Sequence, residues 1–209
     1  MPTRPADRYH HGDLRNALIE TGLEMARTGG PDAVVLRAVS RSAGVSHNAA
    51  YRHFADHEDL LAAVSARCLD RLGALMRERA QAERHEDPVE RAWARLGAIG
   101  RAYVDFARAE PGWFRTAFRP AAVPAPNARG RSADDLAADH PFAQLAACLD
   151  DLVAVGALSA ERRPDAEYAA WSAVHGLSVL LVEGPLAELA DSRALDITET
   201  VLTVVSRGL

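Results

Sequence analysis

The segment from Val34 to Leu61 limits the fold of this chain more than any other stretch of its sequence. It begins with apolar or small residues at the helical spacing i, i+3, i+4 and i+7, which are Leu36, Val39, Ser40 and Ala43. Gly44 follows directly, and glycine is the residue that most readily takes the left-handed conformation at the end of a helix. Ser46 is of a type that caps the start of a helix. The segment therefore predicts two short helices that cross at a sharp glycine turn.

The residues after Ser46 separate into an inner and an outer side. Ala50 and Phe54 are four positions apart and are expected to face inward. The outer side carries hydrogen-bonding or cationic side chains, namely His47, Asn48, Tyr51 and Arg52. A third helix is expected next, because Asp56 can cap it and apolar residues then continue along one face: Leu61, Val64, Cys68, Leu72 and Leu75. A helix over residues 12–28, closed by a Gly-Gly-Pro sequence, is predicted to precede the pair.

Residues 10–62 resemble the DNA-binding domain of TetR/AcrR-family transcriptional regulators, whose recurring pattern is LRxVAxxAGVSxxxxYxHFxxKxxLL. The matching residues are Leu36, Arg37, Val39, Ala43, Gly44, Val45, Ser46, Tyr51, His53, Phe54, Leu60 and Leu61. The resemblance implies an all-α fold with a three-helix helix-turn-helix DNA-binding domain at 12–62 and a helical-bundle domain for ligand binding and dimerisation at 63–209. Residues 1–11 contain two prolines, several basic residues and little apolar content, and they are expected to form a flexible arm. A bare helix-turn-helix can also be a packing device, and that alternative stays open here.

Two positions depart from the family pattern. Val35 stands where a Ser or Thr usually caps the first helix of the pair, so a capping contribution of about 1 kcal/mol is expected to be missing. His57 stands where a Lys usually meets a phosphate. A neutral His donates one hydrogen bond but lacks the fixed charge of Lys. We therefore expect weaker or pH-dependent phosphate binding at the start of the third helix.

The resemblance also implies roles for the outer residues. Side chains expected to hold DNA phosphates are Arg41, Tyr51, His53 and His57. Those expected to face base edges are Arg37, His47, Asn48, Ala49 and Arg52, on a helix that Ser46 caps. The implied partner is a palindromic double-stranded DNA operator bound by a homodimer. The arm at 1–11 carries basic residues that could reach a minor groove or phosphates, or it could stay disordered, as termini commonly do.

The charge of the chain is distributed unevenly. Its formal net charge is −5, and all 24 basic residues are Arg. Between Ala33 and Ala55 there are three Arg and no carboxylate, which gives this segment a charge of +3. An acidic body would limit nonspecific binding to DNA, while the basic face would orient the encounter. Arg suits phosphates and guanine edges because its guanidinium binds both bidentately, although exclusive use of Arg can also reflect genome composition.

From Pro88 onward the pattern stays helical. The predicted helices span 88–109, 113–119, 133–155, 164–183 and 192–207, with a Pro-rich loop at about 119–132. In the helix at 164–183, Trp171, His175 and Gly176 resemble the Trp-His-Gly signature of one C-terminal subgroup of the same family.

A face of small residues on this helix and an apolar face on the last helix predict half of an intersubunit four-helix bundle. The residues concerned are Ala169, Ala173, Gly176, Leu180, Leu195, Leu202 and Val205. The alternative is that both helices pack only within their own subunit.

Most of the aromatic side chains fall in this second domain, and as a set they favour an apolar ligand pocket, although a single aromatic residue at helical spacing is more often plain core. The candidate ligand-binding residues are Tyr103, Trp113, Phe114, Phe118, Trp171 and His175. His175 has no recognisable catalytic partner and no second His at i±4, so we expect neither catalysis nor a metal or cofactor site.

Cysteine usage and hydropathy bear on the compartment. Cys68 and Cys148 form no CxxC or metal-ligand spacing, which argues against a disulfide framework. The apolar run at 177–182 is far too short to span a bilayer, and the chain opens with no signal-like segment. The expected compartment is a reducing cytoplasm, with no membrane partner.

These features predict a ligand-responsive DNA-binding transcriptional regulator, most simply a repressor that binds its operator as a homodimer and is released by a small, largely apolar molecule. The alternative from another class is an all-α enzyme or carrier acting on the pocket ligand, but no acid–base or nucleophile pair supports it. Activation in place of repression stays open, because nothing in the sequence encodes where the operator lies relative to a promoter.

Overall fold

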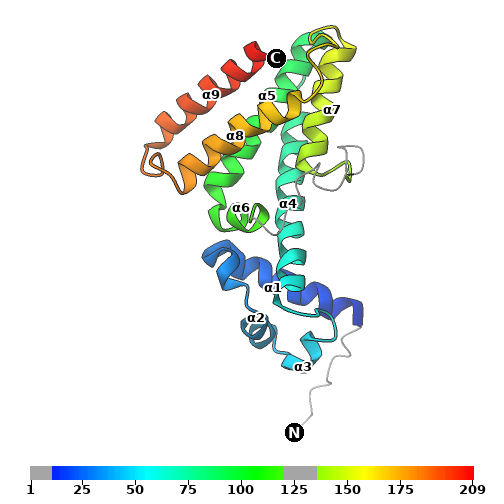
Figure 1. The fold of residues 1–209 in the computed structure, drawn as a ribbon, viewed down its shortest axis with the longest axis vertical. Helices are drawn as coiled ribbons and strands as arrows, with labels where there is room; N and C mark the ends of the chain where they lie inside the picture. Colours follow the sequence, from blue (N-terminus) through cyan, green and yellow to red (C-terminus); the bar gives the residue numbers. More distant parts are fainter. Residues whose placement is uncertain (1–10, 120–135) are drawn as a thin grey trace.

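The structure, a computed structural model, describes residues 11–119 and 136–209, and every regular element in these two ranges is a helix (Figure 1). The all-α prediction is therefore confirmed. The arm expected at 1–11 lies outside the described residues except for His11, which begins the first helix. Most of the loop expected at 119–132 also lies outside them.

Three helices and a helical turn form a helix-turn-helix unit at one end of the molecule (Figure 1). In chain order they are α1 (His11–Gly29), the 3₁₀ turn η1 (Pro31–Ala33), α2 (Leu36–Ser42) and α3 (His47–Ala50). The second helix of the pair is only four residues long, so Phe54 lies beyond its end, yet its ring is fully buried as expected.

The turn between α2 and α3 forms as the sequence predicts. Gly44 has φ +70°, in the left-handed region that favours glycine. The hydroxyl of Ser46 accepts a hydrogen bond from the backbone N–H of Ala49 at 3.2 Å, which caps α3. At the start of α2, Val35 makes no side-chain cap, as expected from its lack of a hydroxyl.

A single long helix, α4 (His57–Ala82), connects this unit to the rest of the molecule (Figure 1). Its 26 residues span about 39 Å at 1.5 Å per residue. Asp56 accepts a hydrogen bond from the N–H of Asp59 at 2.8 Å, and the Asp59 carboxylate accepts one from the N–H of Ala55 at 3.0 Å. This reciprocal pair fixes the point where the helix leaves the helix-turn-helix unit.

The buried face of α4 agrees with the predicted one except at its far end. Leu61, Val64, Cys68 and Leu72 are buried, whereas Leu75 is only half-buried and Met76 takes the inward position. Burial raises the pKa of the Cys68 thiol to about 12, and both cysteines are free.

Five more helices complete the C-terminal domain: α5 (Pro88–Ala109), α6 (Pro111–Ala117), α7 (Pro141–Ala154), α8 (Ala166–Val182) and α9 (Asp191–Gly208). Helix α5 packs against α4, α7, α8 and α9, while α6 lies against both α1 and α4. Helices α8 and α9 lie side by side and run in opposite directions at the end farthest from α3 (Figure 1).

The start of α7 differs from the prediction. Helix was expected from residue 133, but residues 136–140 are non-helical and α7 begins at Pro141. The His140 side chain accepts a hydrogen bond from the N–H of Phe142 at 3.2 Å, and Pro141 occupies the first helical position, where its missing N–H costs nothing. Among the described residues, no helix is both long and apolar enough to cross a membrane.

Candidate nucleic-acid interface and ligand cavity

Exposed basic and hydrogen-bonding side chains gather on α2, α3 and the turn after α3, at the end of the molecule away from α8 and α9 (Figure 1). Arg37 and Arg41 are exposed about one turn apart on α2. Asn48, Tyr51 and Arg52 are exposed on α3 and just beyond it, and Tyr51 keeps 48% of its surface accessible. No described carboxylate pairs with these three Arg. The face therefore keeps its positive charge available.

The other predicted DNA contacts lie on the same unit but are less uniformly exposed. His47 is half-buried, its ring meets the Tyr51 ring edge-on with centroids 4.5 Å apart, and its Nδ1 is buried with no hydrogen-bond partner among the described residues. Ala49 and His53 are half-buried, whereas His57 is exposed at the first turn of α4. The fold thus brings all of the predicted contacts to one end of the molecule, and their contacts with DNA stay a prediction.

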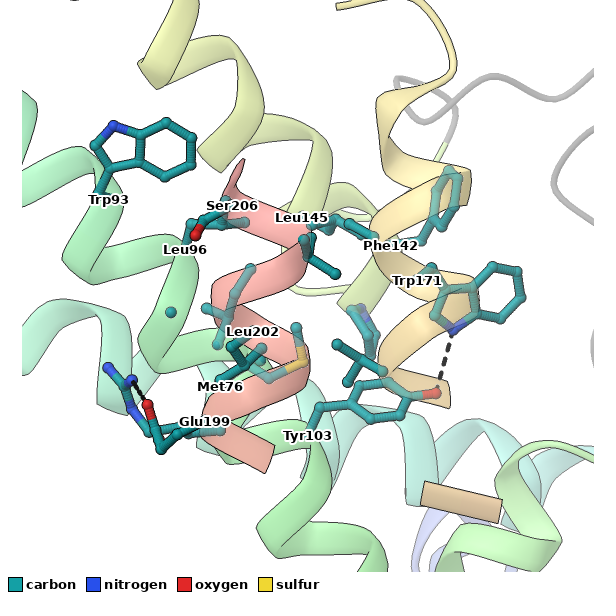
Figure 2. Close-up of a pocket in the computed structure, with 18 of the residues that line it drawn as sticks. Met76, Trp93, Leu96, Tyr103, Phe142, Leu145, Trp171, Glu199, Leu202 and Ser206 are labelled. Atoms are coloured by element: carbon teal, nitrogen blue, oxygen red, sulfur yellow. Dashed lines mark hydrogen bonds and ion pairs between the residues drawn. The ribbon is translucent and has the colours of Figure 1, made fainter. Parts of the chain in front are cut away.

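A cavity of about 260 Å³ lies within the C-terminal domain, bounded by α4, α5, α7, α8 and α9 (Figure 2). Its walls are mostly aliphatic and aromatic, and they include Leu69, Met76, Leu96, Phe142, Leu145 and Val174. Of the six predicted ligand-binding residues, Tyr103, Phe118 and Trp171 line it. The predicted apolar pocket is therefore present, with half of the expected side chains on its wall.

Hydrogen bonds fix the aromatic end of this cavity. The Trp171 indole N–H donates to the Tyr103 hydroxyl at 3.2 Å, and the same hydroxyl lies 2.8 Å from Nδ1 of His175 (Figure 2 shows the Trp171–Tyr103 bond). Because the indole can only donate, the Tyr103 oxygen accepts from it and its own proton can be donated to Nδ1. Burial lowers the pKa of His175 and raises that of Tyr103, so both groups are held neutral.

The other three predicted ligand-binding residues do not line this cavity. His175 stands behind Tyr103 and holds its hydroxyl in place. Phe114 is buried between rings, with centroids 6.0 Å from Tyr103 and 5.1 Å from Phe118. Trp113 points the other way, toward α1, because residues 113 and 114 lie on different faces of the short helix α6.

Trp113 joins the two domains. Its indole N–H donates to the backbone oxygen of Leu23 in α1 at 2.8 Å, and its ring stacks on Phe106 of α5 with centroids 6.3 Å apart. Next to it, Glu110 accepts two hydrogen bonds from the Arg27 guanidinium, at 2.7 and 2.6 Å. Gly112 allows this close approach, since a Cβ there would overlap backbone carbonyl oxygens at the end of α1. Helix α6 thus rests on α1 at one side and on the aromatic end of the cavity at the other.

The predicted dimer face is partly exposed and partly turned inward. On α8 the exposed residues are Ala169, Gly176 and Leu180, while Ala173 is half-buried. Leu195 of α9 is also exposed, and 51% of its surface is accessible, compared with 43% for Leu180. Leu202 and Val205 line the cavity instead, and a Cβ on Gly100 would lie 2.5 Å from Leu202 Cδ2. Both residues thus line the cavity of their own chain, and their contacts with a partner subunit stay a prediction.

Sequence reasoning missed several cavity residues. Met76 could have been found as the position four residues beyond Leu72 on the buried face of α4. Arg101 on α5 and Glu199 on α9 form an ion pair at 3.3 Å on the cavity wall, and they are 98 positions apart in the chain. No local sequence signal could have joined these two residues.

Comparison with known proteins places the chain among bacterial regulators. The family model for bacterial regulatory proteins of the tetR family matches residues 18–64, and a model for the tetracyclin repressor-like C-terminal domain matches residues 96–204. The HTH-type transcriptional repressor Rv3405c of Mycobacterium tuberculosis is 31% identical over 111 residues, which cover 50% of this chain and 57% of that protein. The chain thus spans little more than half the length of the curated relatives it matches.

Solved structures share the fold over nearly the whole chain. A Rhodococcus sp. RHA1 protein of unknown function superposes with a TM-score of 0.72 and 28% identity, covering 98% of this chain and 99% of that one. A TetR-family regulator from Pectobacterium atrosepticum gives a TM-score of 0.64 at 20% identity, with 98% and 97% covered. The structure of RolR in complex with resorcinol gives 0.61 at 17% identity, with 93% and 88% covered.

Proposed function

The chain belongs to the TetR family of bacterial regulatory proteins, and from this premise we propose that it is a repressor whose homodimer binds a palindromic operator and is released by a small, largely apolar effector. In this proposal residues 12–62 form the DNA-binding domain and residues 63–209 hold the effector and the partner subunit. The observation that carries it is an exposed basic face on α2 and α3 and an apolar cavity in the other domain, with α6 packed both on α1 of the first domain and on α5 of the second.

The DNA-binding part of the proposal rests on the exposed residues of α2 and α3. Tyr51 and Arg41 would contact phosphates, and Arg37, Asn48 and Arg52 would face base edges in the major groove. Their exposure and the lack of competing described carboxylates support this role. The His47 ring packs against Tyr51 and would hold that side chain in the direction of the DNA.

The dimer part rests on the exposed face of α8. Ala169, Gly176 and Leu180 bring no charge to this face, and a Cβ on Gly176 would meet no atom within 4 Å. Small and apolar residues at helical spacing allow two helices to approach closely. The proposal requires that pairing of this face and of Leu195 with a second copy set the two recognition helices at half-sites about 34–36 Å apart.

Effector release requires contact between the cavity and the DNA-binding domain. The Tyr103 ring lies on the cavity wall and packs against Phe114 and Phe118 at α6, with centroids 6.0 and 5.7 Å away. The same helix holds α1 through Trp113. A ligand that displaces Tyr103 or Phe118 would therefore shift α6 on α1 and change the angle of the reading helices. The complex of the fold neighbour RolR with resorcinol is consistent with a small aromatic ligand in this fold.

The test begins with selection of binding sites from a random DNA duplex pool, followed by gel-shift and footprinting on the selected sequence. We expect a symmetric footprint for the wild type. Tyr51→Ala should weaken binding at least about tenfold per half-site, because it removes a hydrogen bond to a charged phosphate. Tyr168→Ala, a change of the same type on α8 at the far end of the molecule, serves as the control and should bind like wild type. An unchanged footprint in Tyr51→Ala would refute the assigned orientation of α3.

A further inference from the structure

The charged groups on the cavity wall balance each other. Among the described lining residues, Arg101 and Glu199 are the charged ones, and they pair with each other at 3.3 Å (Figure 2). A net charge on a bound molecule would therefore find no unpaired partner on the described wall, while losing its hydration. The cavity accordingly favours an uncharged ligand.

Most polar groups on the wall are already engaged. The Tyr103 hydroxyl accepts from Trp171 and is bonded to His175. On α9, the Thr203 and Ser206 hydroxyls donate to backbone oxygens of their own helix, at 2.7 and 2.9 Å. These groups have no donor left for a ligand unless an existing bond breaks.

His140 keeps a donor, in addition to the indole N–H of the half-exposed Trp93 and the remaining N–H groups of Arg101. Its Nδ1 accepts the N–H of Phe142 at the start of α7, so the proton of the neutral ring is on Nε2. Burial lowers the pKa of His140 and the nearby charge of Asp70 opposes this, which leaves the neutral ring favoured at pH 7. No acceptor for Nε2 occurs among the described residues, and His140 is part of the cavity wall beside Pro141 and Phe142. His140 thus carries an N–H donor on a ring that the hydrogen bond to Nδ1 holds at the wall of a mostly apolar site.

We propose that the effector is an uncharged, mainly aromatic or aliphatic molecule with one hydrogen-bond acceptor, such as a carbonyl oxygen, and that Nε2 of His140 donates to that acceptor. This inference deepens the proposed function and rests on the cavity being its effector site. It makes His140 a specificity-determining residue, since the apolar walls alone would bind molecules with and without the acceptor equally well.

The test uses three probes that share one skeleton: 2-acetylnaphthalene, which is neutral with a carbonyl, 2-ethylnaphthalene, which lacks an acceptor, and 2-naphthoate, which is an anion. Binding to the purified full chain without DNA is followed by calorimetry and by the fluorescence of Trp93 and Trp171, which both line the cavity. His140→Ser removes the Nε2 donor while keeping an oxygen that can cap α7. Thr203→Val removes a hydroxyl elsewhere on the same wall and is the matched control.

We expect 2-acetylnaphthalene to bind wild type about three- to tenfold more tightly than 2-ethylnaphthalene, as one hydrogen bond provides. That preference should vanish in His140→Ser and persist in Thr203→Val, and 2-naphthoate should be the weakest of the three.

Three results would overturn the inference. Equal binding of the ketone and the hydrocarbon, or a preference that survives in His140→Ser, would remove the role of His140 and leave the effector cavity standing. Tightest binding of the anion would refute the neutral ligand class. Failure of all three probes to bind would refute the stated ligand chemistry, whereas the selected-operator footprint, which needs no probe, would still decide whether the chain binds DNA as proposed.

Discussion

Trp113→Phe tests the contact between the two domains without changing a residue of either binding site. Trp113 lies outside the cavity and far from the exposed residues of α3, and its N–H reaches the Leu23 oxygen of α1. Phenylalanine keeps an aromatic ring in the same place but lacks the N–H and the larger indole. The change should therefore weaken the packing of α6 against α1 and leave the DNA-binding face and the cavity unchanged.

The expected loss follows from the contacts of this ring. A buried neutral hydrogen bond contributes about 1 kcal/mol. The ring atoms missing from phenylalanine were packed against Phe106 and α1, and removing them costs about 1–2 kcal/mol at about 0.8 kcal/mol per carbon group. The free energy of unfolding should fall by about 2–3 kcal/mol in total. The coupling free energy between operator binding and effector binding is typically about 1–3 kcal/mol. It should fall by about 1 kcal/mol, which is the contribution of the lost hydrogen bond.

Urea unfolding followed by circular dichroism measures the first quantity. Affinity for 2-acetylnaphthalene with and without the selected operator measures the second. Trp93→Phe is the matched control, because Trp93 is half-exposed on the cavity wall and lies on α5, which packs mainly against α4 and α6 to α9. Trp93→Phe should change the affinity for the probe by the same factor with and without DNA, so the ratio of these two affinities should equal that of wild type. Trp113 would have no such role between the two domains if Trp113→Phe were as stable as wild type, or if its affinities with and without operator had the same ratio as those of wild type.

Two further predictions concern pH and assembly. Burial holds the pKa of His175 below its ordinary value of about 6.5, so the unfolded chain binds more protons than the folded one as the pH falls through that value, and the free energy of unfolding should decrease on acidification. In urea titrations at several pH values, His175→Gln, which cannot titrate, should reduce the dependence of the free energy of unfolding on pH. An unchanged dependence would show that His175 does not contribute to it. Leu180→Asp places a charge on the exposed face of α8 and should shift sedimentation toward the monomer. The control Val89→Asp, at an exposed position on α5, should sediment like wild type. A dimer of wild-type stability in Leu180→Asp would exclude this face of α8 as the dimer interface.

Local signals explain why the turn and the helix caps of the helix-turn-helix unit could be predicted. Gly44, Ser46 and Asp56 each determine the conformation of their own turn or cap, and the structure has φ +70° at the first and side-chain caps at the other two. The bounds of α5 match for the same reason, because Pro88 begins the helix and the Glu-Pro-Gly sequence ends it. Such signals act over a few residues and depend little on the rest of the fold.

The direction that a helix face takes could not be predicted in the same way. Trp113 and Phe114 were grouped with Trp171 as pocket residues, but α6 crosses between α1 and the cavity, so its faces meet different neighbours. Leu202 is apolar enough for either a dimer face or a cavity wall, and in the structure it lies on the cavity wall next to Gly100 of α5. Both outcomes depend on the crossing of helices that are distant in the sequence.

The proposed function requires that one molecule link an effector cavity to a DNA-reading face. Thermodynamic linkage requires that DNA weaken effector binding by the same factor by which effector weakens DNA binding. The decisive measurement is the affinity of the wild-type chain for 2-acetylnaphthalene, with and without a saturating amount of the selected operator. We predict binding about 5- to 150-fold weaker in the presence of the operator. Equal affinities under the two conditions would contradict the account.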